Sequence, residues 1–376
     1  MHIAIWHKDS KMGNRLKLSS FHLKNFKAVQ DSKAIRFTPL TAFIGNNGSG
    51  KSSIVEALET LQTLVMRDID KAMAPWHGFE HIWNKAVEHR SVKDKITHPM
   101  TFASRGISKE EDFRFALEVV ADPNFDRVYF QGYKAAYGKA DFIERPGFIS
   151  EGTISDPKLK SFVKDWQFLR LNPYEMTEPL PQKRSSGKIT LHKDGSNIAE
   201  YLQSVRDADI RAFDGIIETL KVVLPFAVDL QPAITSELER NVYLNLSEEH
   251  IEGKLAGWLL STGTLRILAI LALLRHPIPA PVIIIEEIEN GLDPRTIHLL
   301  VDEIRHFVES GRGQVIFTTH SPYLLDLLPL SYLVVCDRDE SGGPRFTRPG
   351  SQKALENWAR QFTPGKLYTM GTLTRS

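Results

Sequence analysis

A glycine-rich segment near the N-terminus constrains this chain more than any other feature. Residues 45–52 read Gly-Asn-Asn-Gly-Ser-Gly-Lys-Ser and match G-x-x-x-x-G-K-[ST] at every fixed position. The segment follows an apolar run, Leu40–Ile44, and precedes a stretch, 52–66, whose apolar residues recur at helical spacing. Glycines allow backbone amides to surround a phosphate at the positive end of the following helix. The sequence therefore predicts a phosphate-binding loop between a strand and a helix, in preference to a chance glycine-rich turn.

The same segment supplies the candidate contacts to a nucleotide. We expect Lys51 to reach the β- and γ-phosphates of ATP and the Ser52 hydroxyl to bind Mg²⁺. The full candidate set consists of Gly45, Asn46, Asn47, Gly48, Ser49, Gly50, Lys51, Ser52 and Ser53. ATP and Mg²⁺ are therefore the expected cofactors.

A second constraint is a predicted buried strand, 281–285, that ends in two carboxylates, Glu286 and Glu287. In a parallel α/β sheet, ligands bind at the carboxyl ends of the strands. Glu286 is thus a candidate for holding Mg²⁺, and Glu287 is a candidate for polarising a water molecule toward the γ-phosphate. The alternative interpretation is a strand that simply ends in a solvated acidic turn.

The chain has the alternation of an α/β fold in its last hundred residues. The expected elements are strand Val282–Ile285, helix Arg295–Glu309, strand Gln314–Thr318, helix Pro322–Leu327 and strand Tyr332–Cys336. This order predicts βαβ units and a parallel sheet. Earlier parts favour strands at 15–29, 34–37, 113–120 and 128–133, and helical patterns at 199–224 and 265–274.

Composition bounds the class of protein. The 376 residues include 47 Lys and Arg against 46 Asp and Glu, for a net charge of +1. This balance argues against indiscriminate nucleic-acid binding, although eight basic and two acidic side chains in the first 40 residues leave a local basic face open. The single cysteine, Cys336, excludes an internal disulfide. Without a membrane-length apolar run or a signal-peptide pattern, we expect a cytoplasmic protein that does not contact a membrane.

Three further segments complete a set of motifs. They are 260–266 (Leu-Ser-Thr-Gly-Thr-Leu-Arg), 289–294 (Glu-Asn-Gly-Leu-Asp-Pro) and 318–322 (Thr-Thr-His-Ser-Pro). Together with the phosphate loop and the acidic strand end, they resemble the ABC-type ATPase heads of the SMC/RecF/OLD group, in particular bacterial AAA-family ATPases with ABC-like motifs. Shorter parallels are Phe26–Val29, Asp194–Asn197 and Pro364–Tyr368.

The resemblance implies an α/β P-loop NTPase of ABC-ATPase type, with a mixed, mainly parallel sheet core, an antiparallel β part and a helical lobe. It implies a single head over residues 15–376, preceded by an extension, 1–14. The nucleotide-binding core would comprise 15–160 and 277–376, and the helical lobe with the 260–266 signature would span about 161–276.

The resemblance also implies a dimer, or a higher even oligomer, with ATP between two heads. Ser261 and Gly263 of one subunit would contact the γ-phosphate bound by Lys51 of the other, at the N-terminus of a helix. Glu287 would act as the catalytic base-like residue and His320 would contact the γ-phosphate. From the residues alone, Ser261 also fits an ordinary helix cap, and His320 fits a helix-start residue without a ligand.

The chain departs from this family in several places. Glu286 stands where aspartate is more usual, Ile288 replaces a frequent proline, and Asp293 replaces a frequent histidine in the loop that crosses the dimer interface. A glutamine-loop residue, which such heads have, is not identifiable, since Gln131 and Gln167 are both possible and neither has a decisive context.

Other patterns have plainer interpretations. His77-Gly-Phe-Glu80-His81 fits a zinc-peptidase pattern but is interrupted by Gly78, and Asp337-Arg338-Asp339 resembles a nuclease metal motif with too little chain after it. Trp166–Pro173 favours a packed strand over a base-stacking platform. The basic cluster Lys183, Arg184 and Lys188 favours a solvated loop.

Taken together, the motifs favour a Mg²⁺-dependent ATPase whose head dimerisation controls a separately encoded effector, such as a nuclease or toxin, or a DNA transaction, including a role in antiphage defence. A nucleotide-gated scaffold with little turnover is the first alternative. A transporter nucleotide-binding subunit is less favoured, because Ser261 follows Lys51 by 210 residues, a wider separation than transporter heads have. Direct nucleic-acid binding stays open.

Overall fold

The computed structural model describes residues 16–85, 98–122, 127–150, 152–182, 188–236, 238–349 and 361–373. The expected extension, 1–14, and the cluster members Lys183 and Arg184 lie outside these ranges. Within the described residues, none of the helices combines the length and the apolar character needed to cross a bilayer.

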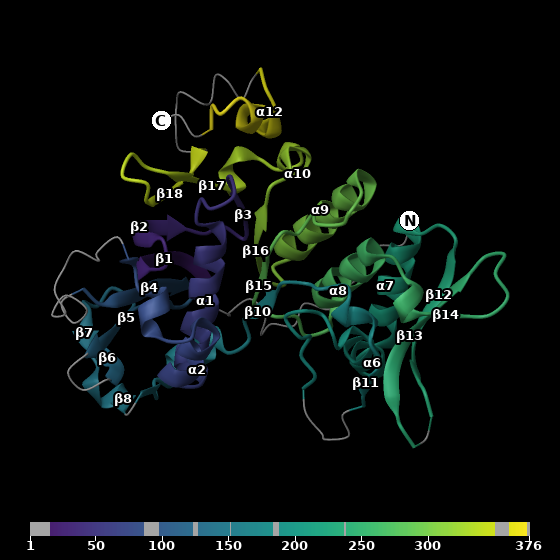
Figure 1. Ribbon diagram of the computed structural model, residues 1–376, viewed down its shortest axis with the longest axis horizontal. Helices are drawn as coiled ribbons and strands as arrows, with labels where there is room; N and C mark the ends of the chain where they lie inside the picture. Colours follow the sequence, from purple (N-terminus) through teal and green to yellow (C-terminus); the bar gives the residue numbers. More distant parts are fainter. Residues whose placement is uncertain are drawn as a thin grey trace.

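A six-stranded central sheet has the order β10-β15-β16-β3-β17-β18 (Figure 1). Its strands are β10 (Gln167–Leu169), β15 (Val282–Ile285), β16 (Gln314–Thr319), β3 (Leu40–Ile44), β17 (Leu333–Arg338) and β18 (Pro344–Thr347). The first five run parallel, and β18 pairs antiparallel with β17. The predicted parallel sheet is confirmed. The central position of β3 places the glycine-rich segment in the middle of the carboxyl edge.

Both faces of this sheet are covered, which explains why its strands are apolar throughout. On one face, Phe43 and Ile284 pack with the apolar side of α1 (Lys51–Met66) and with a second sheet. On the other face, Ile44 and Ile285 pack with α8 (Thr262–Arg275) and α9 (Pro294–Glu309). Side chains of successive residues thus enter different cores, as the period of two in a strand requires.

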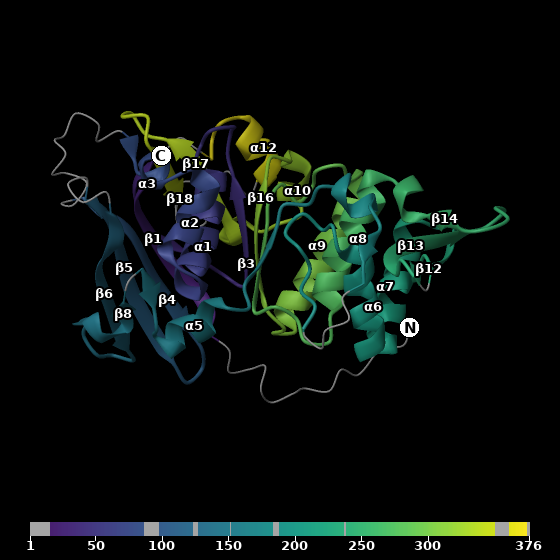
Figure 2. The same ribbon diagram turned by 60° about the horizontal axis from the view of Figure 1, so that its bottom comes forward.

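The second sheet is antiparallel, with the order β2-β1-β4-β5-β6-β7. Its strands are β1 (Lys17–Phe26), β2 (Val29–Arg36), β4 (Met100–Ile107), β5 (Asp112–Asp122), β6 (Arg127–Tyr137) and β7 (Ile143–Glu144). Figure 2 shows α1 between this sheet and the central one. Short elements at its margin are α2 (Ile69–Met73), α3 (Phe79–Ile82), β8 (Ile149–Ser150), β9 (Thr153–Ile154) and α5 (Pro157–Val163).

A lobe at the far end of the molecule combines helices with a third, antiparallel sheet (Figure 1). Its elements are β11 (Leu180–Pro181), α6 (Ile198–Ala208), α7 (Ile210–Val223), β12 (Ala227–Ile234), β13 (Asn241–Glu248) and β14 (Leu255–Ala256). The helical pattern over 199–224 is divided because Asp209 accepts hydrogen bonds from the amides of Arg211 and Ala212 and starts α7. The range expected for the lobe also includes β10, which belongs to the central sheet.

Two short helices on either side of β17 and β18 in the sequence, α10 (Pro322–Asp326) and α12 (Pro364–Thr369), pack against each other beside β17. Gly365 permits this contact, because a Cβ there would lie 2.1 Å from the carbonyl oxygen of Pro322. Its amide donates a hydrogen bond of 2.6 Å to Asp326 Oδ1. The last helix is thereby fixed above the carboxyl edge of the central sheet.

Candidate nucleotide site

The glycine-rich loop connects β3 to α1, as the sequence predicts. Gly48 and Gly50 have φ values of 75° and 99°, a left-handed conformation that glycine adopts without cost. Gly50 precedes the first helical residue, Lys51, and no side chain caps the helix there. The first amides of α1 are consequently left for another acceptor, and a phosphate group is suited to this place.

Neighbouring elements hold the loop in this shape. A Cβ at Gly45 would lie 2.1 Å from the carbonyl oxygen of Cys336 on β17, and one at Gly50 would lie 2.8 Å from Cβ of Pro344 on β18. Arg338 donates hydrogen bonds of 3.1 and 2.7 Å to the carbonyl oxygen of Gly48. Asn46 accepts a hydrogen bond of 3.1 Å from the hydroxyl of Tyr368 on α12.

Lys51 lies inside the loop. Its ammonium group donates to the carbonyl oxygens of Gly45 and Asn46 at 2.7 and 3.0 Å, and the residue is only 5% exposed. Burial lowers the pKa of Lys51, while the charges of Glu287 and Glu289 oppose this shift. The ammonium thus lies within electrostatic range of the acidic strand end.

The first carboxylate of that strand end, Glu286, is buried and incompletely hydrogen-bonded. Its Oε1 atom has no partner, and its backbone amide donates to the carbonyl oxygen of Leu169 at 2.9 Å. Burial raises the pKa of Glu286, and the nearby charge of Arg170 opposes the rise. A buried carboxylate oxygen without a donor is suited to a cation. Glu286 therefore fits a magnesium-binding role, together with the hydroxyl of Ser52 in the first turn of α1.

The second carboxylate, Glu287, has an unusual backbone conformation. Its φ is 48°, a left-handed value that costs free energy for a residue with a side chain. The amide of Glu287 donates to Thr318 Oγ1 at 2.9 Å, and the next amide, of Ile288, donates to the carbonyl oxygen of Thr318. The side chain is exposed, and its Oε2 accepts a 3.4 Å hydrogen bond from Asn290. The turn at the end of β15 thus leaves the Glu287 carboxylate exposed at the carboxyl edge of the sheet, where it is accessible to a ligand.

The segment after β16 is tied to the same turn. The backbone amide of His320 donates a 2.6 Å hydrogen bond to Glu289 Oε1, and the other oxygen of Glu289 is buried without a partner. Ser321 caps α10 by accepting from the amide of Leu324. His320 therefore stands between two fixed positions, with its half-buried imidazole at the carboxyl edge of the sheet.

The signature segment begins α8. Ser261 is its cap, since its Oγ accepts from the amide of Thr264 at 3.1 Å and lies 2.7 Å from the Thr264 hydroxyl. Gly263 packs against the loop that follows Glu287, because a Cβ there would lie 2.6 Å from the carbonyl oxygen of Gly291. Ser261 itself is exposed. The segment is thus an ordinary helix start at the surface, joined to the acidic loop.

Neither candidate glutamine is available to a ligand at this site: one lies in another sheet, and the other is hydrogen-bonded to backbone carbonyls. Gln131 is an exposed residue of β6, in the antiparallel sheet. The amide of Gln167 donates to the carbonyl oxygens of Leu191 and Phe168, at 2.7 and 3.3 Å. The residue beside Glu286 at the end of β10 is instead Arg170, which no sequence motif marks. Arg338 and Tyr368 were missed as well, although Tyr368 lies in a motif that the resemblance included.

The remaining patterns have structural interpretations. Asp339 accepts hydrogen bonds from Ser341 and from the amide of Gly343, so it closes the β17–β18 turn. Trp166 and Phe168 are buried, which confirms a packed strand. Lys188 pairs with Asp165 at 3.2 Å.

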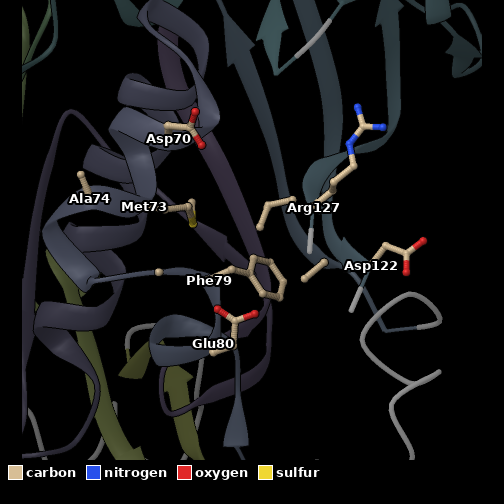
Figure 3. Close-up of a pocket in the computed structure, with 10 residues that line it drawn as sticks. Asp70, Met73, Ala74, Phe79, Glu80, Asp122 and Arg127 are labelled. Carbon is tan, nitrogen blue, oxygen red and sulfur yellow. The ribbon is translucent and has the colours of Figure 1, made fainter. Parts of the chain in front are cut away.

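The histidine pattern at 77–81 is divided between two short elements. His77 follows a 3-10 turn, Gly78 has a φ of 126°, and α3 begins at Phe79. Within the described residues, no group of three or more His, Cys, Asp or Glu side chains could hold a metal ion. Phe79 and Glu80 line a cavity of about 280 Å³ together with Asp70, Asp122 and Arg127. Figure 3 shows how these side chains lie. This cavity lies between α2 and the β5–β6 end of the antiparallel sheet, apart from the phosphate loop.

Comparisons with known proteins agree with this geometry. A family model described as "AAA domain, putative AbiEii toxin, Type IV TA system" matches residues 40–326. A crystal structure of an Smc head bound to the C-terminal winged-helix domain of ScpA is similar at a TM-score of 0.56 and 15% identity, over 88% of this chain and 97% of the other. An Smc head with an extended coiled coil from Pyrococcus furiosus, bound to the C-terminal domain of ScpA, gives 0.57 and 14%, over 92% and 100%. A search of curated proteins finds no match.

Proposed function

Because the chain belongs to this AAA-domain family and has the fold of SMC-type ATPase heads, we propose that it binds and hydrolyses ATP with Mg²⁺ at the loop of residues 45–53. The observation that carries the proposal is the juxtaposition at one sheet edge. There, an uncapped helix N-terminus, a buried lysine and a buried carboxylate with an unpartnered oxygen lie together. The first amides of α1 have no side-chain acceptor and Glu286 Oε1 has no partner, so the amides suit a phosphate group and the carboxylate oxygen suits Mg²⁺, with the Lys51 ammonium as a further cation for the phosphates.

The residues of this chain divide the work between binding and hydrolysis. The loop amides and Lys51 bind and orient the phosphates, and the Ser52 hydroxyl and Glu286 would hold Mg²⁺. Mg²⁺ supplies neutralisation of the phosphate charge when bound. Glu287 orients the attacking water and takes up its proton, in a position fixed by the Thr318 hydroxyl. His320 contacts the γ-phosphate from the adjacent strand end.

We further propose that two copies enclose the nucleotide. The support is the start of α8, where Ser261 and Thr262 are exposed and Gly263 is partly exposed beside the loop that follows Glu287. In the proposed dimer, this N-terminus approaches the γ-phosphate on the partner's loop. Residues 15–376 would then act as one head, and its dimerisation would control a separately encoded effector or a DNA transaction, with antiphage defence as the proposed context.

The test is phosphate release by the full chain, in multiple and single turnover. We expect Glu287→Gln to retain ATP binding and to lose turnover by about 100-fold or more, because the amide keeps the size of the side chain but cannot take up a proton. Glu309→Gln, at the end of α9, is the matched control and should behave as wild type. If Glu287→Gln releases phosphate as fast as wild type, the catalytic assignment is wrong. A wild type that binds ATP without releasing phosphate would indicate a nucleotide-gated scaffold.

A further inference from the structure

Six charged side chains, Glu286 among them, form a cluster where the end of β15 meets α1. Three are carboxylates, Glu56 and Glu59 on α1 and Glu286 after β15, and three are cations, Lys27, Lys193 and Arg170. Four of them form two close pairs. Lys27 lies 2.6 Å from Glu56, and Lys193 lies 2.6 Å from Glu59.

Arg170 and Glu286 are the two that remain. Among the described residues, neither a hydrogen bond nor an ion pair joins their side chains, and Glu286 Oε1 has no partner at all. Arg170 is exposed, and its backbone amide donates to the carbonyl oxygen of Lys193 at 2.8 Å. Arg170 and Glu286 thus lie near each other without forming an ion pair, unlike the Lys27–Glu56 and Lys193–Glu59 pairs.

The register of the sheet places them side by side. β10 pairs in parallel with β15, with Leu169 opposite Ile285, so Arg170 and Glu286 are the next positions on adjacent strands. Leu169 and Ile285 enter the core beneath α8 and α9, and the preceding Phe168 and Ile284 enter the core beneath α1. Because faces alternate along a strand, Arg170 and Glu286 are on the α1 side, toward the first turns of that helix. After burial, the charge of Arg170 is the largest influence on the pKa of Glu286.

An unpaired anion and an unpaired cation on one face suit a ligand that carries both signs. A buried carboxylate with a free oxygen accepts a metal ion, and a free guanidinium donates to phosphate oxygens. A metal–triphosphate complex at the start of α1 has this distribution of charge. The glutamines that qualified from the sequence are exposed in another sheet or bonded to backbone carbonyls, so Arg170 is the polar side chain that stands at this strand end.

We propose that Arg170 binds the terminal phosphate of the nucleotide from the same subunit, beside the metal held by Glu286. This inference rests on the proposed function and adds a second phosphate-binding cation to Lys51. Arg170 is the first residue of the connection from the central sheet to the lobe. A γ-phosphate bound by Arg170 would therefore contact the point where these two parts of the chain join. ADP lacks the group that Arg170 contacts, so the residue discriminates ATP from ADP.

The experiment measures equilibrium binding of ATP and ADP to the full chain by competition with a fluorescent nucleotide, with Mg²⁺ and with EDTA. We expect Arg170→Ala to weaken ATP binding by about 10- to 100-fold, the range for a hydrogen bond to a charged group, and ADP binding by less than about 3-fold. Arg170→Lys should recover part of the loss. Arg67→Ala, an exposed arginine at the other end of α1, is the matched control and should change neither affinity.

Two further variants separate the outcomes. If Arg170 only balances the charge of Glu286, Arg170→Ala will have no effect on ATP binding in a Glu286→Gln background, whereas a phosphate contact predicts the same loss there and in EDTA. Equal losses for ATP and ADP, or no loss, would overturn the proposal. Lys51→Ala reports on the proposed function independently. If it abolishes binding while Arg170→Ala does not, the ATP site stands and only the role of Arg170 fails.

Discussion

The two helices that carry the proposed phosphate contacts, α1 and α8, begin in opposite ways. α1 starts after Gly50, which is in a left-handed conformation, with no side-chain cap, and its first residue is the buried Lys51. α8 starts at Ser261, which satisfies the amide of Thr264 with its own hydroxyl. Both helices present a positive end, but α8 has a side-chain cap and α1 has none. We infer that α1 provides the primary phosphate site, and that α8 can join only when a ligand is already held by another copy.

The largest test of this contrast is removal of the lysine at α1. We expect Lys51→Ala to weaken ATP binding by about 100-fold or more, because the substitution removes a charge-assisted contact to phosphate and leaves the carbonyl oxygens of Gly45 and Asn46 without their donor. Isothermal titration with ATP and Mg²⁺ measures the effect. Normal affinity in this variant would show that the nucleotide binds elsewhere.

An intermediate effect is expected where α8 meets the acidic loop. Gly263→Ala places a Cβ 2.6 Å from the carbonyl oxygen of Gly291, so the signature or the loop must shift, at a cost of about 1–3 kcal/mol. We expect the free energy of unfolding, measured by denaturant titration, to fall by that amount. ATP-dependent self-association should weaken, and the ATP affinity of the single head should not change. A fall in ATP affinity in dilute solution would place α8 at its own subunit's nucleotide and contradict the contrast.

The smallest effect separates the capping role of Ser261 from its proposed role across the dimer. Ser261→Ala and Asp209→Ala each remove the side-chain cap of a helix, α8 and α7 respectively, and should each cost about 1 kcal/mol of unfolding free energy. Denaturant titration checks this equality. Only Ser261→Ala should also reduce ATP-dependent association. If both variants associate normally, Ser261 is a cap and nothing more.

The sequence predicted those parts of the site that are local in the chain. The phosphate loop is fixed by glycines at set spacing, and the strand before Glu286 by a continuous apolar run, so both needed only neighbouring residues. Arg170 could not be found in this way. Its importance depends on the register of β10 against β15, more than a hundred residues apart in sequence.

The lobe shows a different kind of omission. The alternating run Asn241–Leu246 buries Val242, Leu244 and Leu246, and this period of two predicts a strand, yet the lobe was expected to be helical. The resemblance suggested helices here, and the local pattern was the better guide. The fold class itself, a mainly parallel P-loop sheet with an antiparallel part, is confirmed.

The central claim is that the ATP site at α1 of one copy is completed by the N-terminus of α8 of another copy. Its most direct test is sedimentation velocity of the Glu287→Gln protein with and without Mg²⁺ and ATP, because this variant should bind ATP without consuming it. The account predicts a single head without nucleotide and a dimer or higher even oligomer with saturating ATP, and it predicts that adding Ser261→Ala prevents this shift. An unchanged sedimentation coefficient at a concentration where ATP binding is saturated would contradict it.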